Sequence, residues 1–297
     1  MKTVNSQKTS TAGARLRAEI ERGTFVSAPG VFDLISALIA DQVGFKALYV
    51  TGYGTVASSL GLPDAGLATY SQMLERVSRI VEMTKTPVIA DADTGYGGLL
   101  NVRHTVQGYE RAGVAAIQIE DQEFPKKCGH TPNRRVIPTP EMVRKIQVAS
   151  DSRTSADFLI VARTDARSKY GIDEAIVRGN AYANAGADII FIESPESEAE
   201  LAEIGRRIEK PTLANLVNGG RTPMLGAGEL ARLGFALAIF PVAGFLAAGH
   251  ALKQVYEDIA TGGALTDRVP LYPFEQFNEL LGFPDVWEFE KRYPEVS

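Results

Sequence analysis

Two carboxylates stand two residues apart in Asp91-Ala92-Asp93, where an apolar run ends. Residues two apart on an extended segment point to the same side, so both carboxylates can face one point. Like charges held close together repel each other unless a cation or a proton lies between them. Magnesium binds one or two carboxylates directly and keeps water or substrate oxygens in its other positions. The pair, with Glu120 after the next apolar run, therefore predicts a Mg²⁺ site in which Mn²⁺ is an alternative. The competing interpretation is a pair of solvated aspartates that cap the following helix.

A second cluster is the loop Lys126-Lys127-Cys128-Gly129-His130, which prolines flank. Cys128 is the single cysteine, so the chain has no internal disulfide and no multi-cysteine metal site. A lone cysteine is usually a small buried hydrophobic residue. Here two lysines and a histidine surround the thiol, and nearby cations favour the thiolate. We therefore expect an acid/base or nucleophilic cysteine on a mobile loop that closes over a substrate.

A glycine-rich segment, Gly52-Tyr53-Gly54-Thr55-Val56-Ala57, matches the fingerprint of dinucleotide-binding proteins. Gly61-Leu62-Pro63 interrupts the helix that this fingerprint requires, and the acidic residue after the next strand comes too late. A turn whose backbone N–H groups bind a substrate carboxylate is the better interpretation.

Short apolar runs alternate with helical patterns along the chain, and several runs are apolar throughout, which is typical of parallel strands covered on both faces. Glycine ends three of the helical patterns just before a strand, at Gly113, Gly186 and Gly234. The eight predicted strands are Thr24–Ala28, Ala47–Thr51, Pro87–Asp91, Ala116–Glu120, Phe158–Arg163, Asp188–Glu193, Thr212–Asn215 and Ala236–Phe240. This pattern predicts an α/β fold, a (β/α)₈ TIM-type barrel, with a doubly wound open sheet as the main competitor.

In such a barrel the catalytic groups lie at the C-terminal ends of the strands. Any strand can end in a polar residue, but here the set is dominated by carboxylates, with one arginine and one asparagine. These strand ends carry Thr51, Asp91, Asp93, Glu120, Arg163, Asp165, Glu193, Asn215 and Pro241.

Composition limits the function classes. The chain has 297 residues, 45% of them hydrophobic, and a net charge of -5, so no global basic field indicates nucleic acid or an acidic membrane. The N-terminus lacks the apolar run of a signal peptide, and the stretch Phe235–Gly249 is too short to span a bilayer. We interpret that stretch as a strand, a turn and a buried helix, and we expect a cytoplasmic protein. Residues 1–260 are predicted to form the barrel, and residues 261–297 an apolar helical tail that packs on the barrel or on a partner subunit.

Several ordered motifs in addition to the aspartate pair and the cysteine loop resemble the isocitrate lyase/phosphoenolpyruvate mutase superfamily, over residues 27 to 293 approximately. The loop is similar to that of the lyase branch, which includes 2,3-dimethylmalate lyase, methylisocitrate lyase and petal death protein. These further motifs are Tyr49-Val50-Thr51-Gly52-Tyr53-Gly54, Leu60-Gly61-Leu62-Pro63-Asp64, Ile119-Glu120-Asp121-Gln122, Ala162-Arg163-Thr164-Asp165 and Leu213-Ala214-Asn215.

The resemblance implies a magnesium-dependent retro-aldol cleavage of a 2-hydroxy dicarboxylate or tricarboxylate. The implied products are a 2-oxo acid, pyruvate or glyoxylate, and a second carboxylate, and Cys128 matches the family's general acid. The other implied catalytic residues are Tyr49 (a candidate base), Lys126, His130 and Glu120. The implied metal residues are Asp91, Asp93 and Glu120. The implied substrate contacts are Thr51, Gly52, Tyr53, Asp64, Arg163, Glu193, Asn215, Thr222, Pro223 and Pro241.

Two departures from methylisocitrate lyases favour a dicarboxylate, an alkylmalate such as 2,3-dimethylmalate. Phe277 stands where those enzymes carry an arginine, and Thr51-Gly52-Tyr53 replaces a smaller turn. The alternatives are methylisocitrate cleavage, oxaloacetate hydrolysis or decarboxylation, phosphonate mutase chemistry and a non-catalytic binding protein. The resemblance also implies a homodimer or homotetramer that exchanges C-terminal helices.

Overall fold

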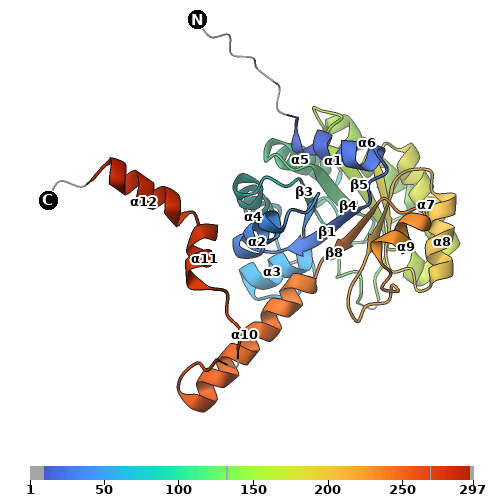
Figure 1. The fold of residues 1–297 in the computed structure, drawn as a ribbon. Helices are drawn as coiled ribbons and strands as arrows, with labels where there is room; N and C mark the ends of the chain where they lie inside the picture. The colour runs from blue at the N-terminus through green and yellow to red at the C-terminus, as the bar shows by residue number, and fades with distance from the viewer. Residues whose placement is uncertain (1–9, 132, 268, 295–297) are drawn as a thin grey trace, which may run out of the picture. The chain divides into compact units, whose positions relative to one another are not determined.

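The computed structural model describes residues 10–131, 133–267 and 269–294. Eight parallel strands close into a barrel in chain order, and β8 pairs with β1 (Figure 1). The strands are β1 (Val26–Val31), β2 (Leu48–Val50), β3 (Val88–Asp91), β4 (Ala116–Glu120), β5 (Leu159–Thr164), β6 (Ile189–Ile192), β7 (Thr212–Asn215) and β8 (Leu237–Phe240). The (β/α)₈ prediction is confirmed, and the open-sheet alternative is wrong.

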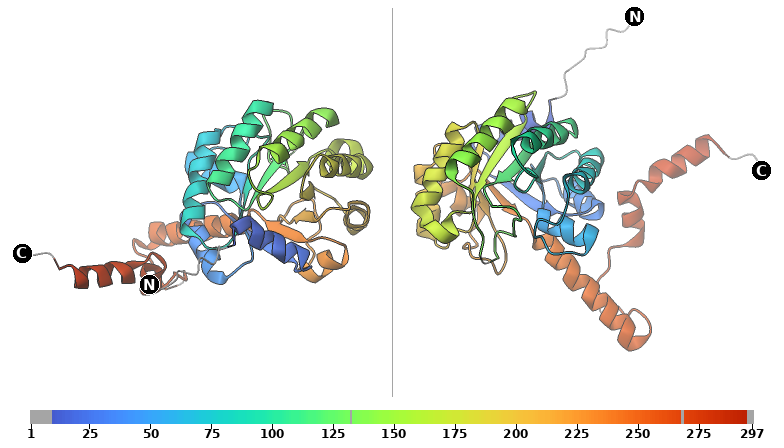
Figure 2. Two further views of the ribbon diagram at one scale, coloured as in Figure 1. Left: turned by 90° about the horizontal axis from the view of Figure 1, so that it is seen from above. Right: turned by 180° about the vertical axis from the view of Figure 1, so that it is seen from behind.

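Helices surround the strands, as the two further views show (Figure 2). In the barrel they are α1 (Ala12–Glu21), α2 (Leu34–Val43), α3 (Gly52–Leu60), α4 (Tyr70–Met83), α5 (Leu99–Arg111), α6 (Thr139–Ser152), α7 (Arg167–Asn184), α8 (Glu198–Arg207) and α9 (Ala227–Arg232). Three further helices follow β8, namely α10 (Ala243–Gly262), α11 (Phe274–Leu280) and α12 (Phe283–Arg292). No helix in the described ranges has the length and hydropathy that crossing a bilayer requires.

The strands are buried on both faces, which explains their apolar runs. In β6, Ile189 and Phe191 belong to a cluster that fills the inside of the barrel, while Ile190 and Ile192 belong to the layer under the helices. Leu16 of α1 joins the inner cluster and is fully buried. Alternating side chains therefore build two concentric apolar layers, which hold the strand ends in fixed positions.

Glycine ends the helices where the sequence indicates it. Gly113, Gly186 and Gly234 all have a positive φ, of 84°, 108° and 95°, which an L-residue rarely adopts. The turn predicted at Gly52–Ala57 is wrong, because this segment forms α3. That helix ends at Gly61, where φ is 65°, so the interrupting motif limits its length rather than preventing it.

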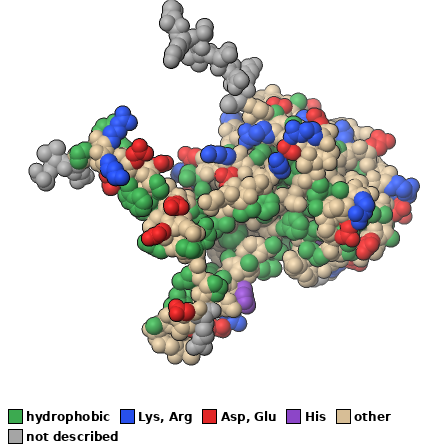
Figure 3. Space-filling model, in the orientation of Figure 1, with side chains coloured by type: hydrophobic (Ala, Val, Ile, Leu, Met, Phe, Trp, Pro, Cys, Tyr) green, Lys and Arg blue, Asp and Glu red, His purple; other side chains and the backbone are tan. Residues whose placement is uncertain are grey.

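The chain divides into two compact units, Met1–Phe245 and Leu246–Ser297. No residue of α10 is buried in the single chain, so the predicted buried helix is wrong here. The second unit carries exposed apolar side chains, of which Phe274 is 80% exposed, and Figure 3 shows such side chains along its helices. Further exposed apolar residues of this unit are Leu252, Tyr256, Trp287 and Phe289. Packing of the tail on the barrel or on a partner subunit stays a prediction.

Candidate active site

The aspartate pair lies at the end of β3. Asp91 is the last residue of the strand, and Asp93 has a φ of 49°, so the chain turns left-handed there instead of staying extended. The backbone N–H of Asp93 donates to Oδ1 of Asp91 at 3.0 Å. A Cβ built on Gly52 would lie 2.7 Å from Oδ2 of Asp91 and 3.6 Å from Oδ1 of Asp93. Both carboxylates therefore face the space beside Gly52, and the turn at Asp93 replaces the extended geometry that we expected.

A lysine neutralises part of this charge. The Nζ atom of Lys126 lies 2.5 Å from Oδ1 of Asp64 and 2.6 Å from Oδ1 of Asp93, and all three side chains are buried. Burial acts to lower the pKa of Lys126, but the carboxylates of Asp93 and Asp64 outweigh it and raise this pKa well above its usual value. Burial raises the pKa of Asp93 to about 7, against the opposing effect of Lys126. Lys126 thus acts on the aspartates and not on the thiol of Cys128, contrary to the expectation from the sequence.

The residues that could hold a divalent ion offer oxygen atoms only. Oε1 of Glu120 is buried and has neither a hydrogen-bond nor an ion-pair partner among the described residues, whereas Oε2 of Glu120 lies 3.1 Å from Arg163 and Oδ1 of Asp93 lies 2.6 Å from Lys126. Burial raises the pKa of Glu120 well above its usual value, although Arg163 opposes this shift. Within the described ranges no three metal-ligating side chains come close enough together to hold an ion by themselves. The donors therefore fit Mg²⁺, an ion that prefers oxygen and completes its shell with water or substrate.

Next to the aspartates, Arg163 is surrounded by three carboxylates. Its guanidinium lies 3.1 Å from Oε2 of Glu120, 2.9 Å from Oδ1 of Asp165 and 3.3 Å from Oε2 of Glu193. Burial acts to lower the pKa of Arg163, but these three carboxylates raise it well above its usual value. Arg163 therefore stays charged and can face an anionic group of a substrate.

The cysteine loop docks on this cluster through Gly129. A Cβ at Gly129 would lie 2.4 Å from Nη2 of Arg163 and 2.6 Å from Oε2 of Glu193, so glycine permits the close approach. The hydroxyl of Ser194 donates to the carbonyl of Gly129 at 3.1 Å. Asn215 donates to Oε2 of Glu193 at 3.0 Å.

The ring of His130 completes this contact. Its Nε2 lies 3.2 Å from Nδ2 of Asn215 and 3.6 Å from Oε1 of Glu193. Burial lowers the pKa of His130, and Glu193 opposes the shift. A neutral ring that accepts from Asn215 fits this geometry, so the loop is held by hydrogen bonds as well as by charge.

Cys128 is partly buried, and burial raises the pKa of its thiol. The backbone N–H of His130 and the charge of Arg163 act in the other direction, while Asp64 and Glu193 add to the rise. The sequence predicted that nearby lysines would favour the thiolate, which is wrong for this arrangement. A protonated thiol is the form that can donate a proton.

Gln118 is a site residue that the sequence analysis missed. The hydroxyl of Tyr49 donates to Oε1 of Gln118 at 2.9 Å, and Nε2 of Gln118 donates to Oδ1 of Asp91 at 3.3 Å. Burial raises the pKa of Tyr49 well above its usual value, and Asp91 adds to the shift. This hydroxyl is therefore poorly suited to act as the base suggested for it. A polar residue inside the apolar run Ala116–Glu120 was the signal that could have identified Gln118.

The remaining predicted substrate contacts differ in burial and in their surroundings. Thr51 is buried beside Gly52, whereas Tyr53 is 37% exposed and packs edge-to-face on Phe245 with ring centroids 5.9 Å apart. Thr222 is buried, and its hydroxyl has no hydrogen-bond partner among the described residues. The backbone of Pro241 lies against Gly30, on the β8–β1 side of the barrel.

Comparison with known proteins adds a second line of argument. The family model described as phosphoenolpyruvate phosphomutase matches residues 16–260. The chain is 48% identical over 284 residues to a 2,3-dimethylmalate lyase of Eubacterium barkeri, which covers 94% of this chain and 97% of the relative. It is 44% identical over 286 residues to a 2-methylisocitrate lyase of Aeropyrum pernix, which covers 96% of this chain and 91% of the relative.

Solved structures agree in fold. An oxaloacetate acetylhydrolase in complex with 3,3-difluorooxalacetate matches with a TM-score of 0.91 and 33% identity, covering 97% of this chain and 98% of the other. A 2,3-dimethylmalate lyase matches with a TM-score of 0.90 and 35% identity, covering 97% of both chains. A phosphonopyruvate hydrolase in complex with oxalate and Mg²⁺ matches with a TM-score of 0.86 and 30% identity, covering 96% of this chain and all of the other. The chain belongs to the phosphoenolpyruvate mutase/isocitrate lyase superfamily.

Proposed function

We propose that the protein is a carbon–carbon lyase that cleaves an alkyl-substituted malate, such as 2,3-dimethylmalate, to pyruvate and a carboxylate such as propionate. The observation that carries the proposal is the docking of the Lys126–His130 loop on Arg163 and Glu193 through Gly129. It brings the part of the chain that holds the thiol to a buried cation, beside the carboxylates of β3 and β4. The 48% identity to a 2,3-dimethylmalate lyase supports the substrate class.

The carboxylate side of the site suits a 2-hydroxy acid. Asp91, Asp93 and Glu120 would hold Mg²⁺, in part through water, and the ion would stabilise the negative charge that develops on the substrate oxygens. Gly52 leaves room beside both aspartates for a small group. Gln118 fixes Asp91 and keeps the hydroxyl of Tyr49 turned toward itself.

The thiol side suits proton delivery. The hydroxyl on carbon 2 loses its proton to a base and becomes the carbonyl of pyruvate, while the bond between carbons 2 and 3 breaks and its electron pair stays on carbon 3, which then needs a proton. Cys128, protonated because burial raises its pKa, would donate that proton from Sγ. Arg163, with Thr51, Gly52 and Tyr53, would bind the carboxylate of the 2-oxo acid half, and the docked loop would exclude water until the proton has moved.

Two other reactions have specific support. The similarity to a 2-methylisocitrate lyase favours a tricarboxylate substrate, and the similarity to an oxaloacetate acetylhydrolase favours oxaloacetate. We favour the alkylmalate over the tricarboxylate because Phe277 stands where methylisocitrate lyases carry an arginine, so this chain lacks the cation that could bind a third carboxylate. We favour lyase chemistry over hydrolysis because of the complete cysteine loop.

A screen in one coupled assay tests the proposal. Pyruvate release would be followed with lactate dehydrogenase for 2,3-dimethylmalate and 2-methylisocitrate, in Mg²⁺ and again after chelation. We expect turnover of the alkylmalate that is lost on chelation and restored by Mg²⁺, with propionate identified by NMR. Comparable turnover of both substrates would defeat the preference for the dicarboxylate, and equal rates with and without chelator would defeat the metal-assisted mechanism.

A further inference from the structure

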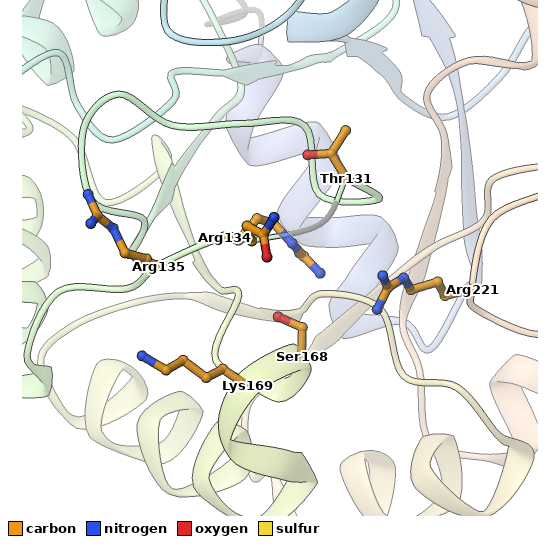
Figure 4. A pocket seen from close by; sticks show the side chains of 7 residues that line it. Thr131, Arg134, Arg135, Ser168, Lys169 and Arg221 are labelled. Atoms are coloured by element: carbon orange, nitrogen blue, oxygen red, sulfur yellow. The ribbon is translucent and has the colours of Figure 1, made fainter.

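A cavity of about 470 Å³ opens beside the cysteine loop, outside the site described above. Its walls come from three segments, which are the loop after β4, the start of α7 and the loop after β7 (Figure 4). The lining includes the cations Arg134, Arg135, Lys169 and Arg221, and no carboxylate is among its described residues. Three of these cations pair with a carboxylate outside the lining, namely Arg134 with Asp165, Arg135 with Glu123 at 2.8 Å and Arg221 with Glu196.

Arg134 supplies the decisive observation. This side chain is only 6% exposed, and its Nη1 pairs with Oδ1 of Asp165. Its Nε and Nη2 atoms are buried and donate to no acceptor. Buried guanidinium N–H groups without an acceptor are unfavourable and rare in folded proteins. The described residues therefore leave two donors of a buried cation unused on a wall of the cavity.

Arg221, from the loop after β7, faces Arg134 across the cavity. In Figure 4 the guanidinium ends of Arg134 and Arg221 face each other, while the hydroxyl of Ser168 donates to the carbonyl of Asp165 at 3.2 Å. Arg221 has one carboxylate partner, Glu196 at 3.3 Å. Lys169 forms no ion pair with any residue that the structure describes; its ammonium lies 5.0 Å from the ring centroid of Tyr170, and in Figure 4 it extends away from Arg221.

We propose that this cavity binds a small oxyanion, a phosphate or a carboxylate group, between Arg134 and Arg221. A guanidinium presents paired N–H donors that match the oxygens of both groups. The site is distinct from the substrate pocket, because the carboxylate of Asp165 pairs with both Arg134 and Arg163 and separates the two cations.

The position of the anion gives it a role. Arg134 follows the segment that carries Cys128, whereas Arg221 and Lys169 belong to the barrel rim. An anion that joins them ties the cysteine loop to β5–α7 and β7–α9. Occupancy should therefore slow the opening of the loop and reduce access to the thiol.

Calorimetry on the full chain tests the site with inorganic phosphate as one probe and succinate as the other. We expect Arg221→Gln to weaken binding of at least one probe tenfold or more. Arg206→Gln, which removes an exposed cation of α8 outside the cavity, should leave binding unchanged. A tighter Kd for phosphate identifies a phosphate ligand, and a tighter Kd for succinate identifies a carboxylate. Circular dichroism establishes that both variants are folded.

Alkylation of Cys128 by iodoacetamide gives the second readout. We expect the tighter probe to slow alkylation of the wild type at least threefold and to leave the rate for Arg221→Gln unchanged. Absence of binding by either probe, equal binding by Arg221→Gln and the wild type, or equal protection of the thiol in both would overturn the proposal. Equal protection would place the anion in the substrate pocket.

Discussion

The ammonium nitrogen of Lys126 lies 2.6 Å from Oδ1 of Asp93, in a buried ion pair that the neighbouring Asp64 shares. A cation of the chain thus lies against one of the carboxylates assigned to Mg²⁺. Removing one partner of a buried pair leaves an uncompensated charge, which is more costly than the pair is stabilising. The ammonium of Lys126 therefore compensates the charge of the aspartates when no metal ion is bound. Without this ammonium, the stability of the folded chain should depend on a bound Mg²⁺.

Lys126→Gln should make stability depend on Mg²⁺. Without the ammonium, Asp64 and Asp93 lose their counter-charge, so we expect melting in a chelating buffer to fall by several degrees, consistent with a loss of about 3 kcal/mol. Added Mg²⁺ should raise the melting temperature of the variant more than that of the wild type, because bound ion stabilises the folded state. Differential scanning calorimetry with and without Mg²⁺ measures both changes.

The matched control is Lys127→Gln. Lys127 is the next residue of the same loop and its side chain is exposed. The Lys127→Gln variant should have the melting temperature of the wild type, and Mg²⁺ should raise that temperature by the same amount in both. An equal response of the Lys126 and Lys127 variants would contradict the role given to the buried pair.

Gly129→Ala tests the docking of the loop. The added Cβ would lie 2.4 Å from Nη2 of Arg163 and 2.6 Å from Oε2 of Glu193, both of which are buried and paired. The loop must shift, and a displacement of about 1 Å can lower the rate about 100-fold. We expect kcat/KM for the alkylmalate to fall by that amount while the melting temperature changes little. Gly228→Ala, where a Cβ meets no atom closer than 3.9 Å, should keep full activity.

The fold could be predicted further than the site. Strands buried on both faces are largely apolar, so β6 and β8 are visible in the sequence, and so are the glycines that end helices. The helix α3 was not, because its residues Gly52 and Gly54 are poor helix formers and only the surrounding barrel favours the helix. Packing overrides local propensity at this position.

For the polar residues of the site, the sequence predicts their positions but not their partners. Their place at the ends of strands follows from the barrel, since parallel strands carry their C-terminal ends to one face. Their partners do not follow, because pairs such as Lys126 with Asp64, or Gln118 with Tyr49, depend on side-chain directions set by tertiary packing. The predicted direction of the pKa shift of Cys128 was wrong for that reason. Charges adjacent in sequence were assumed to be adjacent in space.

The thiol of Cys128 should react slowly at neutral pH. Burial raises its pKa above the ordinary value of about 8.5, so the thiolate fraction at pH 7 is smaller than in a free peptide. We expect the rate of alkylation by iodoacetamide to rise about tenfold per pH unit from pH 7 until the raised pKa is passed, because thiolate is the reacting form. Mass spectrometry of the single cysteine measures the rate, and unfolding in urea gives the reference. A plateau below pH 8 would contradict the raised pKa.

Replacement of the acid separates lyase from decarboxylase chemistry. Cys128→Ser replaces the thiol with a hydroxyl, a much weaker acid, so we expect kcat for cleavage of 2,3-dimethylmalate to fall by about 100-fold or more. Decarboxylation of oxaloacetate should decline less, because the aspartate pair with Mg²⁺ can stabilise an enolate without a proton from the loop. Coupled assays of pyruvate from both substrates give the two rates. Equal losses for both reactions would show that the thiol supports binding or folding rather than donating a proton.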